Sequence, residues 1–255
     1  MKKLVLSLND APATGRTTTC ELIHGLWRRQ GLGHSRWHTA TDQPGGPGRS
    51  TFVDLTSGLS DDEVVRWLDK SSLVMLDVAS GDGASLVEEF VRGDLPEILS
   101  ELECTVTVLS VLNGQTRAEH SLLQLAGLLR DEAEYVVVRR EQAGRDWLLP
   151  ACQRAMHHLG ATEIHLPDWP AELAAAAAAE GDHGVEWMAR ASALPRMAQG
   201  LLRSWWLECD QRLEAAAPLL WPDDLDPSPD SHGLDSRGRS HQPSYQLLTA
   251  SYFSE

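Results

Sequence analysis

The sequence predicts an α/β domain with a mainly parallel, doubly wound sheet, followed by a helical C-terminal region and a disordered tail. Short β-rich runs alternate with helical stretches, and several of these runs are almost continuously apolar, such as Tyr135-Val136-Val137-Val138. Strands that are buried on both faces have this composition, whereas half-exposed strands alternate polar and apolar residues. The alternation with helices indicates βαβ units, whose parallel strands are covered by helices on both faces.

The expected elements follow the chain in order. Strands are predicted at residues 3–8, 51–55, 73–78, 105–112 and 134–139, with a weaker one at 163–166. Helices are predicted around residues 17–30, 60–70, 84–92, 115–130 and 146–158. The sequence therefore predicts three parts: an α/β domain over residues 1–168, a helical extension packed on it over 169–221, and a flexible acidic tail over 222–255.

The helical extension carries an apolar stripe. Met197, Leu201 and Trp205 recur at four-residue steps, which places them on one side of a helix. We expect this side to pack against the sheet, and a surface for a protein partner is the alternative. The tail is rich in Pro and Asp and poor in apolar residues, so it is expected to lack regular structure.

Composition excludes several classes of protein. The chain of 255 residues has 22 basic and 37 acidic residues, a net charge of −15, which argues against direct, non-specific DNA binding. It has no stretch of 18 apolar residues, so no membrane span is expected. The cysteines lie far apart, which argues against a disulfide framework or a zinc site and fits a reducing, cytoplasmic location. They are Cys20, Cys104, Cys152 and Cys209.

The turn after the first predicted strand has the layout of a phosphate-binding loop. It runs Asn9-Asp10-Ala11-Pro12-Ala13-Thr14-Gly15-Arg16-Thr17-Thr18-Thr19 and leads into a helix. Backbone N–H groups at a helix N-terminus point outward, and the helix dipole favours an anion there. Against the pattern G-x-x-x-x-G-K-[ST], Gly15 and Thr17 match, Asp10 replaces the first Gly, and Arg16 replaces the Lys. The turn equally suits a simple strand-to-helix connection that binds no phosphate.

Two acidic residues follow later predicted strands. Asp54 ends the run Phe52-Val53-Asp54-Leu55, and Asp77 ends the strand at 73–78. Because ligands bind in the crevice at the carboxyl ends of parallel strands, both carboxylates are expected near the loop. There they can hold Mg²⁺ or orient a water, although a helix cap or a turn is the alternative for each.

In their order, these motifs resemble the ParA/MinD superfamily of P-loop ATPases, and especially its relatives encoded by plasmid stability, mobilisation and conjugative-transfer regions. The family pattern K-G-G-x-G-K-[ST]-T corresponds here to residues 11–18, and its two strand-end acids correspond to Asp54 and Asp77. The resemblance covers roughly residues 1–165. It implies a P-loop NTPase-like fold that binds ATP and Mg²⁺, with self-association or a protein partner.

The resemblance also assigns residue roles. The nucleotide-binding residues would be Thr14, Gly15, Arg16, Thr17 and Thr18. The catalytic residues would be Arg16 on the phosphates and Asp54 positioning water, and Thr17 and Asp77 would serve Mg²⁺. Arg139 or Arg140 stands where relatives often place a base-contacting Asn.

The loop departs from the family at Ala11, which replaces the signature lysine, and at Pro12, Ala13 and Arg16. Arg presents a wide planar fork and Pro lacks a backbone donor, so the sequence predicts weak or absent hydrolysis. An ATP-dependent switch in plasmid partition, mobilisation or conjugation is the first functional hypothesis. A non-catalytic adaptor that binds a partner through its C-terminal helices is the second, and an unrelated α/β enzyme is the third.

Overall fold

The computed structural model describes residues 1–11, 14–39, 50–53, 60–140, 148–179 and 194–222. These residues form a seven-stranded sheet in the order β3-β2-β4-β1-β5-β6-β7. Every pair of neighbouring strands is parallel, which confirms the predicted fold class. The strands are β1 (Lys2–Ser7), β2 (Ser35–His38), β3 (Ser50–Phe52), β4 (Leu73–Asp77), β5 (Cys104–Leu112), β6 (Glu134–Arg140) and β7 (Thr162–Leu166).

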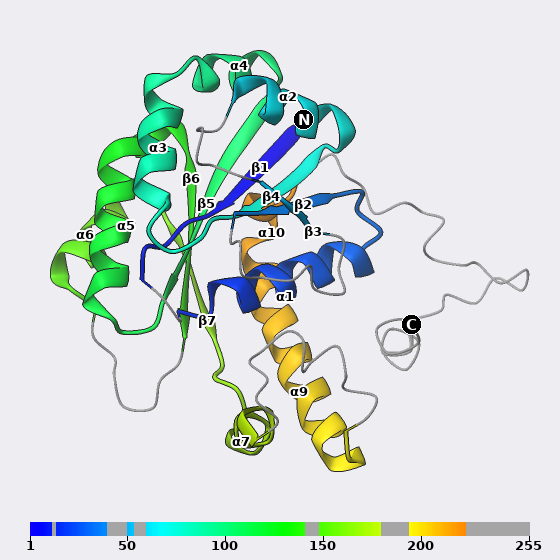
Figure 1. Cartoon of the computed structure of the whole chain (residues 1–255). Coiled ribbons are helices and arrows are strands. Elements are labelled where there is room, and N and C mark those ends of the chain that lie inside the picture. Colours follow the sequence, from blue (N-terminus) through cyan, green and yellow to red (C-terminus); the bar gives the residue numbers. More distant parts are fainter. Residues whose placement is uncertain (12–13, 40–49, 54–59, 141–147, 180–193, 223–255) are drawn as a thin grey trace, which may run out of the picture.

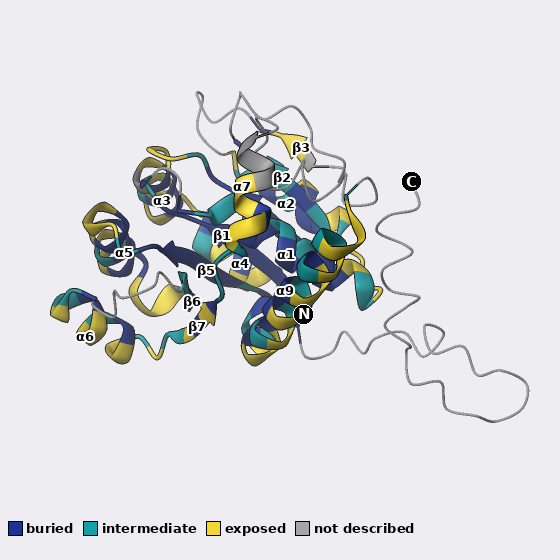
Figure 2. Ribbon diagram, turned by 90° about the horizontal axis from the view of Figure 1, so that it is seen from below, coloured by how far each residue is buried: buried dark blue, intermediate teal, exposed yellow. Residues whose placement is uncertain are grey.

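Helices cover both faces of the sheet, as Figure 1 and the end-on view in Figure 2 show. One face packs against α1, α9 and α10, and the opposite face packs against α2 to α6. The helices are α1 (Arg16–Arg29), α2 (Asp61–Lys70), α3 (Gly83–Arg92), α4 (Leu95–Glu101), α5 (Thr116–Leu129), α6 (Pro150–His158), α7 (Ala171–Ala179), α9 (Arg196–Leu213) and α10 (Ala217–Leu220).

The apolar composition of the central strands follows from this layered packing. In β1, Val5 packs into the core on the α1 face, while Leu4 and Leu6 pack into the core on the α3 face. Successive side chains of a strand point to opposite faces, so a strand covered on both sides needs apolar residues at every position.

Helix α9 contributes to the hydrophobic core on one face of the sheet. Its residues Leu202, Trp205, Cys209 and Leu213 are buried together with β5, β6 and α1. Trp205 also donates a hydrogen bond from Nε1 to the carbonyl of Pro167 at 3.1 Å. Of the stripe expected on this helix, Trp205 is buried and Leu201 is partly buried in this core, whereas Met197 at its start is exposed. The tail from residue 223 lies outside the described residues.

One strand was not expected from the sequence. β2 lies between β4 and the edge strand β3, so the run predicted as the second strand is the third, and its β-structure ends at Phe52. The sequence Ser-Arg-Trp-His of β2 is polar, yet Arg36 and His38 are buried. Arg36 is tolerated there because it pairs with carboxylates from β4 and α1, and such a partner does not show in a pattern of apolar residues.

The central position of β1 determines where a ligand can approach. The chain passes from β1 through α1 to β2 on one side, and from β4 past β1 to β5 on the other. The strand order therefore reverses around β1, and in open α/β sheets the crevice at such a reversal, outside the carboxyl ends of the strands, is where ligands bind.

Candidate functional site

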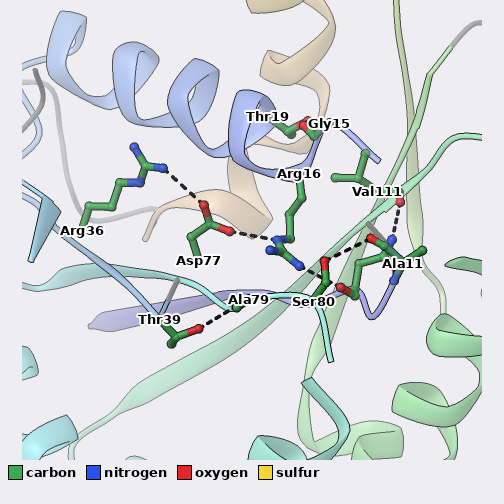
Figure 3. A network of polar contacts seen from close by, with 11 residues as sticks. Ala11, Gly15, Arg16, Thr19, Arg36, Thr39, Asp77, Ala79, Ser80 and Val111 are labelled. Carbon is green, nitrogen blue, oxygen red and sulfur yellow. Dashed lines mark hydrogen bonds and ion pairs between the residues drawn. The ribbon is translucent and has the colours of Figure 1, made fainter. Parts of the chain in front are cut away.

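The loop after β1 is fixed to the neighbouring strand by Asn9. The Nδ2 of this buried residue donates to the carbonyl of Val111 on β5 at 2.5 Å, and its Oδ1 accepts from the N–H of Ala11 at 2.8 Å. Ser80, after β4, donates from Oγ to the carbonyl of Ala11 at 3.4 Å. Figure 3 shows these contacts around the start of the loop. The entry of the loop is therefore held from both strands that flank β1.

Asp10 has a structural contact that the motif comparison did not suggest. Its Oδ1 accepts a hydrogen bond from the N–H of Gly83, the first residue of α3, at 3.2 Å. Its own N–H donates to Oγ of Ser121 on α5 at 3.2 Å. A carboxylate at the start of a helix is stabilised by the helix dipole. Asp10, at the position of the first glycine of the motif, thus connects the loop to α3 and α5.

Gly15 gives the loop its turn into α1. It is the N-cap of the helix and has φ 87° and ψ 16°, the left-handed conformation that favours glycine. As a glycine, this N-cap residue has no side chain with which to cap the helix, and the first turn of α1 contains no acidic residue. The carbonyl of Gly15 accepts from both the N–H and Oγ1 of Thr19, at 2.9 Å and 3.0 Å. The helix therefore begins at the sheet rim with its positive dipole end uncompensated by an acid of its own first turn, which suits an anion.

The three threonines predicted to bind nucleotide differ in their exposure. Thr14 is buried, with 2% of its surface exposed, whereas Thr17 and Thr18 in the first turn of α1 are partly exposed. Backbone groups at all three positions lie at the start of the helix. Only the hydroxyls of Thr17 and Thr18 belong to partly exposed residues that a ligand can approach directly.

Arg16 turns its guanidinium inward. Its Nε donates to Oδ1 of Asp77 at 2.9 Å, and its Nη1 donates to the carbonyl of Asn9 at 2.7 Å, as Figure 3 shows. The side chain is only 10% exposed. In this position Arg16 connects the end of β4 to the loop, and protein oxygens accept hydrogen bonds from its guanidinium.

Asp77 lies between two guanidinium groups. Its Oδ1 pairs with Arg16, and its Oδ2 lies 3.4 Å from Nη2 of Arg36, which also pairs with Glu21 of α1. The Asp77 side chain is 3% exposed. Removing one partner of a buried ion pair typically costs about 3–5 kcal/mol, because a charge is left buried without compensation. This network is therefore a strong internal connection among β4, β2 and α1.

A third arginine approaches the loop from the end of β6. If Gly15 carried a Cβ, that atom would lie 2.6 Å from Nη1 and 3.1 Å from Cδ of Arg140, so the side chain of Arg140 runs directly over Gly15. Arg140 also pairs with Asp168, after β7, through an Nη2–Oδ1 distance of 3.1 Å. This pair is more exposed than the pair of Arg16, with 23% of the Arg140 side chain and 41% of the Asp168 side chain accessible. Exposed pairs of this kind contribute about 0–1 kcal/mol.

Cysteine chemistry does not fit this site. Cys20 lies on α1 beside the loop and is fully buried. Burial, with a smaller contribution from the nearby negative charge of Asp77, raises the pKa of its thiol to about 12. The thiol is therefore protonated at neutral pH, and the thiolate is the nucleophilic form. Within the residues that the structure describes, no group of three or more His, Cys, Asp or Glu side chains could hold a metal ion.

The structure brings most of the predicted site residues together. Gly15, Arg16 and Asp77 meet at the carboxyl rim of the sheet, with Thr17 and Thr18 in the adjoining helical turn. Asp54 lies outside the described residues. Asp10, Arg36 and Arg140 also lie in this region. Their contacts with Gly83, Asp77 and Gly15 were not expected from the motif. In the sequence, Arg36 stands in the short polar run of residues 35–38. Such a run does not identify a buried ion pair.

Comparisons with known proteins give structural similarities but no family. No family model matches the sequence, and no curated protein matches it. Solved structures similar to the chain include the MinD cell division protein of Aquifex aeolicus, with 11% identity, coverage of 84% of this chain and 97% of that chain, and a TM-score of 0.46. The MinC:MinD cell division protein complex of Aquifex aeolicus gives 13% identity, coverage of 84% and 96%, and a TM-score of 0.44. PAB0955, a GTPase in its apo form from Pyrococcus abyssi, gives 15% identity, coverage of 82% and 84%, and a TM-score of 0.32.

At these identities the similarities concern the fold alone. A separate observation concerns membranes. Among the described residues, no helix is both long enough and apolar enough to cross a bilayer.

Proposed function

We propose that the chain binds a nucleoside triphosphate, ATP with Mg²⁺, at the start of α1, and that it hydrolyses this ligand weakly or not at all. The observation that carries the proposal is the start of α1 itself. The helix follows the central strand of a parallel sheet, at the point where the strand order reverses, and it begins at a left-handed glycine without a capping side chain or an acidic first turn. Each of these features favours a phosphate at that position.

The residues of the loop fit a phosphate group. The backbone N–H groups of residues 15–18 would bind the phosphate oxygens, and the partly exposed Thr17 and Thr18 would add their hydroxyls. Thr14 is buried and would contribute through its backbone and by packing. When bound, such a ligand would offset the positive end of the α1 dipole, which no acid of the first turn offsets now.

The fit of Mg²⁺ is less direct. Thr17 and Asp77 are the residues that we propose for the metal, but both carboxylate oxygens of Asp77 face arginine side chains. A role of Asp77 toward Mg²⁺ would require Arg16 or Arg36 to move away from it. We therefore derive no hydrolytic step through the metal, and the proposed role of Asp54 in positioning water stays a prediction from the sequence.

We expect weak hydrolysis because the positive charge of Arg16 is engaged by protein groups. Phosphoryl transfer depends on positioning and on cations that neutralise the charge developing on the transferred group, and a single arginine finger is worth about 10³–10⁵ in rate. Arg16 is engaged by Asp77 and by the carbonyl of Asn9. Ala11, which replaces the signature lysine of the ParA/MinD pattern, is buried and offers no charge. Binding depends less on these cations than catalysis does, because the loop amides carry part of it.

The wider role remains a prediction from the sequence resemblance. A ParA/MinD-like switch in plasmid maintenance, mobilisation or conjugative transfer would couple nucleotide binding to self-association or to a protein partner. An adaptor that uses α9 gains little support from its surface. Leu202, Trp205 and Leu213 are buried against the sheet and two further large apolar residues are partly buried, which leaves Met197 and Leu207 as its exposed large apolar residues.

The experiment compares the native chain with Arg16→Lys for Mg²⁺-dependent ATP binding and for turnover. Arg66→Lys is the matched control, because Arg66 is an exposed arginine on α2. We expect the native chain to bind ATP, Arg16→Lys to change the affinity by less than roughly tenfold, a factor worth about 1.4 kcal/mol, and turnover to stay near background in all three proteins. Robust native turnover that is lost in Arg16→Lys would contradict the weak hydrolysis. Absence of ATP binding by the native chain would contradict the proposed function.

A further inference from the structure

We propose that Arg140, and not the motif residue Arg16, is the cation that contacts the phosphate groups of a ligand bound at the start of α1. This inference rests on the proposed function and adds to it the residue that recognises the phosphate chain. The family resemblance assigns the phosphate contact to Arg16. The contacts of the two side chains favour Arg140 instead.

Arg140 lies directly over the glycine at which α1 begins. It is the last residue of β6, and its side chain crosses the open side of Gly15, with Cδ, Cζ and Nη1 at 3.1, 3.5 and 2.6 Å from where a Cβ of Gly15 would stand. A glycine at this place is therefore needed twice: for its positive φ and for the room that it leaves to the guanidinium. The guanidinium thus lies against Gly15, the N-cap residue of α1.

The guanidinium groups of Arg16 and Arg140 differ in exposure and in how they are paired. Arg16 is 10% exposed and is held by the buried carboxylate of Asp77 and the carbonyl of Asn9. Arg140 is 23% exposed, and its carboxylate partner Asp168 is 41% exposed, so water already screens that pair. Turning Arg16 toward a ligand would leave the charge of Asp77 short of one partner. Arg140 can exchange Asp168 for a phosphate while Asp168 is solvated by water.

The chemistry of a guanidinium suits a phosphate. A guanidinium is a planar fork of N–H donors that binds phosphate oxygens in pairs, and it stays charged at any physiological pH. Together with the amides of α1, Arg140 would surround a phosphate from the helix side and from the β6 side. The site would therefore recognise a chain of phosphates, as in a nucleoside triphosphate or an inorganic triphosphate, more strongly than a single phosphate on a nucleoside.

The chain offers a closely matched control. Arg139 is the preceding residue of β6, and it pairs with Glu163 of β7 at 2.8 Å, just as Arg140 pairs with Asp168. Both arginines belong to β6, and each pairs with a carboxylate. Among the described residues, Arg140 is the one whose side chain lies over Gly15. A general effect of net charge would appear in both pairs, whereas a phosphate contact would appear in one.

The experiment measures binding of ATP, AMP and inorganic triphosphate by isothermal titration calorimetry at constant salt concentration. We expect Arg140→Ala to weaken binding of ATP and of inorganic triphosphate by roughly tenfold or more, as loss of a hydrogen bond to a charged group does. AMP should be affected less. Arg139→Ala should stay within about threefold of the native chain, as expected for a screened surface charge. Asp168→Asn should strengthen triphosphate binding because it removes the competing carboxylate, and Glu163→Gln should not.

The outcomes separate this inference from the proposed function. If the native chain binds triphosphate and Arg140→Ala binds it equally well, the role of Arg140 is wrong and the function stands. Tighter binding by Arg140→Ala would show that the guanidinium covers the site, which also overturns the inference. Failure of the native chain to bind any of the three compounds would overturn both. Circular dichroism and the thermal midpoint establish that each variant folds, and if Arg140→Ala does not, Arg140→Lys must still bind triphosphate more weakly than the native chain.

Discussion

The amino ends of the strands form one edge of the sheet, the amino edge, and their carboxyl ends form the opposite one, the carboxyl edge. Both hold buried cations, but the contacts of these cations differ. At the amino edge, Nζ of Lys3 donates to Oε2 of Glu134 at 2.8 Å and to the carbonyls of Pro218 and Leu219 at 3.2 and 3.1 Å. These contacts fasten the α10 segment to the sheet. At the carboxyl edge, Arg16 and Arg36 share Asp77, and beside them α1 begins without a capping side chain.

The difference shows that a buried charge does not by itself mark a binding site. The Lys3 ammonium has three donors, and three protein oxygens accept from it, so its hydrogen-bonding capacity is met within the chain. The carboxyl edge has an equally well-paired network, but it adds a helix start with nothing acidic in its first turn. We infer the ligand from the helix start and from Arg140, and we expect the Arg16–Asp77–Arg36 network to stabilise the chain in the absence of a ligand.

The largest expected effect concerns this network. Asp77→Asn keeps the shape of the side chain but leaves Arg16 and Arg36 without their shared carboxylate, so we expect the free energy of unfolding to fall by about 3 kcal/mol. Asp82→Asn, at an exposed residue of the following turn, should change it by less than about 0.5 kcal/mol. Urea denaturation measures both values. Equal stability of the two variants would contradict this expectation.

The amino edge gives the next largest effect. Lys3→Met retains the length of the buried side chain but leaves the carbonyl of Pro218 without this donor, and we expect a loss of about 2 kcal/mol. The neighbouring Lys2 pairs with the exposed Asp69 at 3.5 Å, so Lys2→Met should cost less than about 0.5 kcal/mol. The same denaturation experiment compares the two lysines. A larger loss for Lys2→Met would contradict the described role of Lys3.

These contacts also explain which parts of the fold and of the site could be predicted from the sequence alone. The strands around β1 could be predicted because burial on both faces requires apolar residues at every position. β2 could not, because Arg36 is accommodated by acids from two other elements. The glycine and the helix start of the loop follow from local geometry, whereas the direction of Arg16 depends on Asp77, which is 61 residues away. Asp10 likewise meets Gly83 at a separation of 73 residues, which no spacing motif encodes.

A third buried ion pair, away from both edges, gives a pH-dependent prediction. Asp210 of α9 pairs with Arg29 of α1, and burial raises the pKa of Asp210 to about 6, against an ordinary value of 3.8. Between these values the folded chain holds a proton that the unfolded chain has lost, so the contribution of Asp210 to stability decreases as the pH rises from about 4 to 6. We expect the stability difference between the native chain and Asp210→Asn to shift by about 1–2 kcal/mol over that range. A difference that is constant with pH would contradict the raised pKa.

The smallest expected effect concerns Gly15. Gly15→Ala places a Cβ on a residue with φ 87° and displaces Arg140, and we expect a loss of about 1 kcal/mol. Gly127→Ala in α5 is the control of opposite sign, because nothing lies within 4 Å of its Cβ position and alanine favours a helix interior by about 0.5–1 kcal/mol. Thermal denaturation measures both. Stabilisation by both substitutions would show that the left-handed turn at Gly15 is not required.

Phosphate binding at the start of α1 is tested most directly by comparing ligand protection at the two edges. Amide hydrogen exchange of the native chain is followed with and without a saturating concentration of ATP–Mg²⁺. We expect slower exchange at the start of α1, at residues 15–18, and unchanged exchange around α10 at the amino edge, because the phosphates would accept hydrogen bonds from the first N–H groups of α1. Unchanged exchange at residues 15–18 under conditions in which ATP is bound would contradict the central claim that this loop binds the phosphate chain.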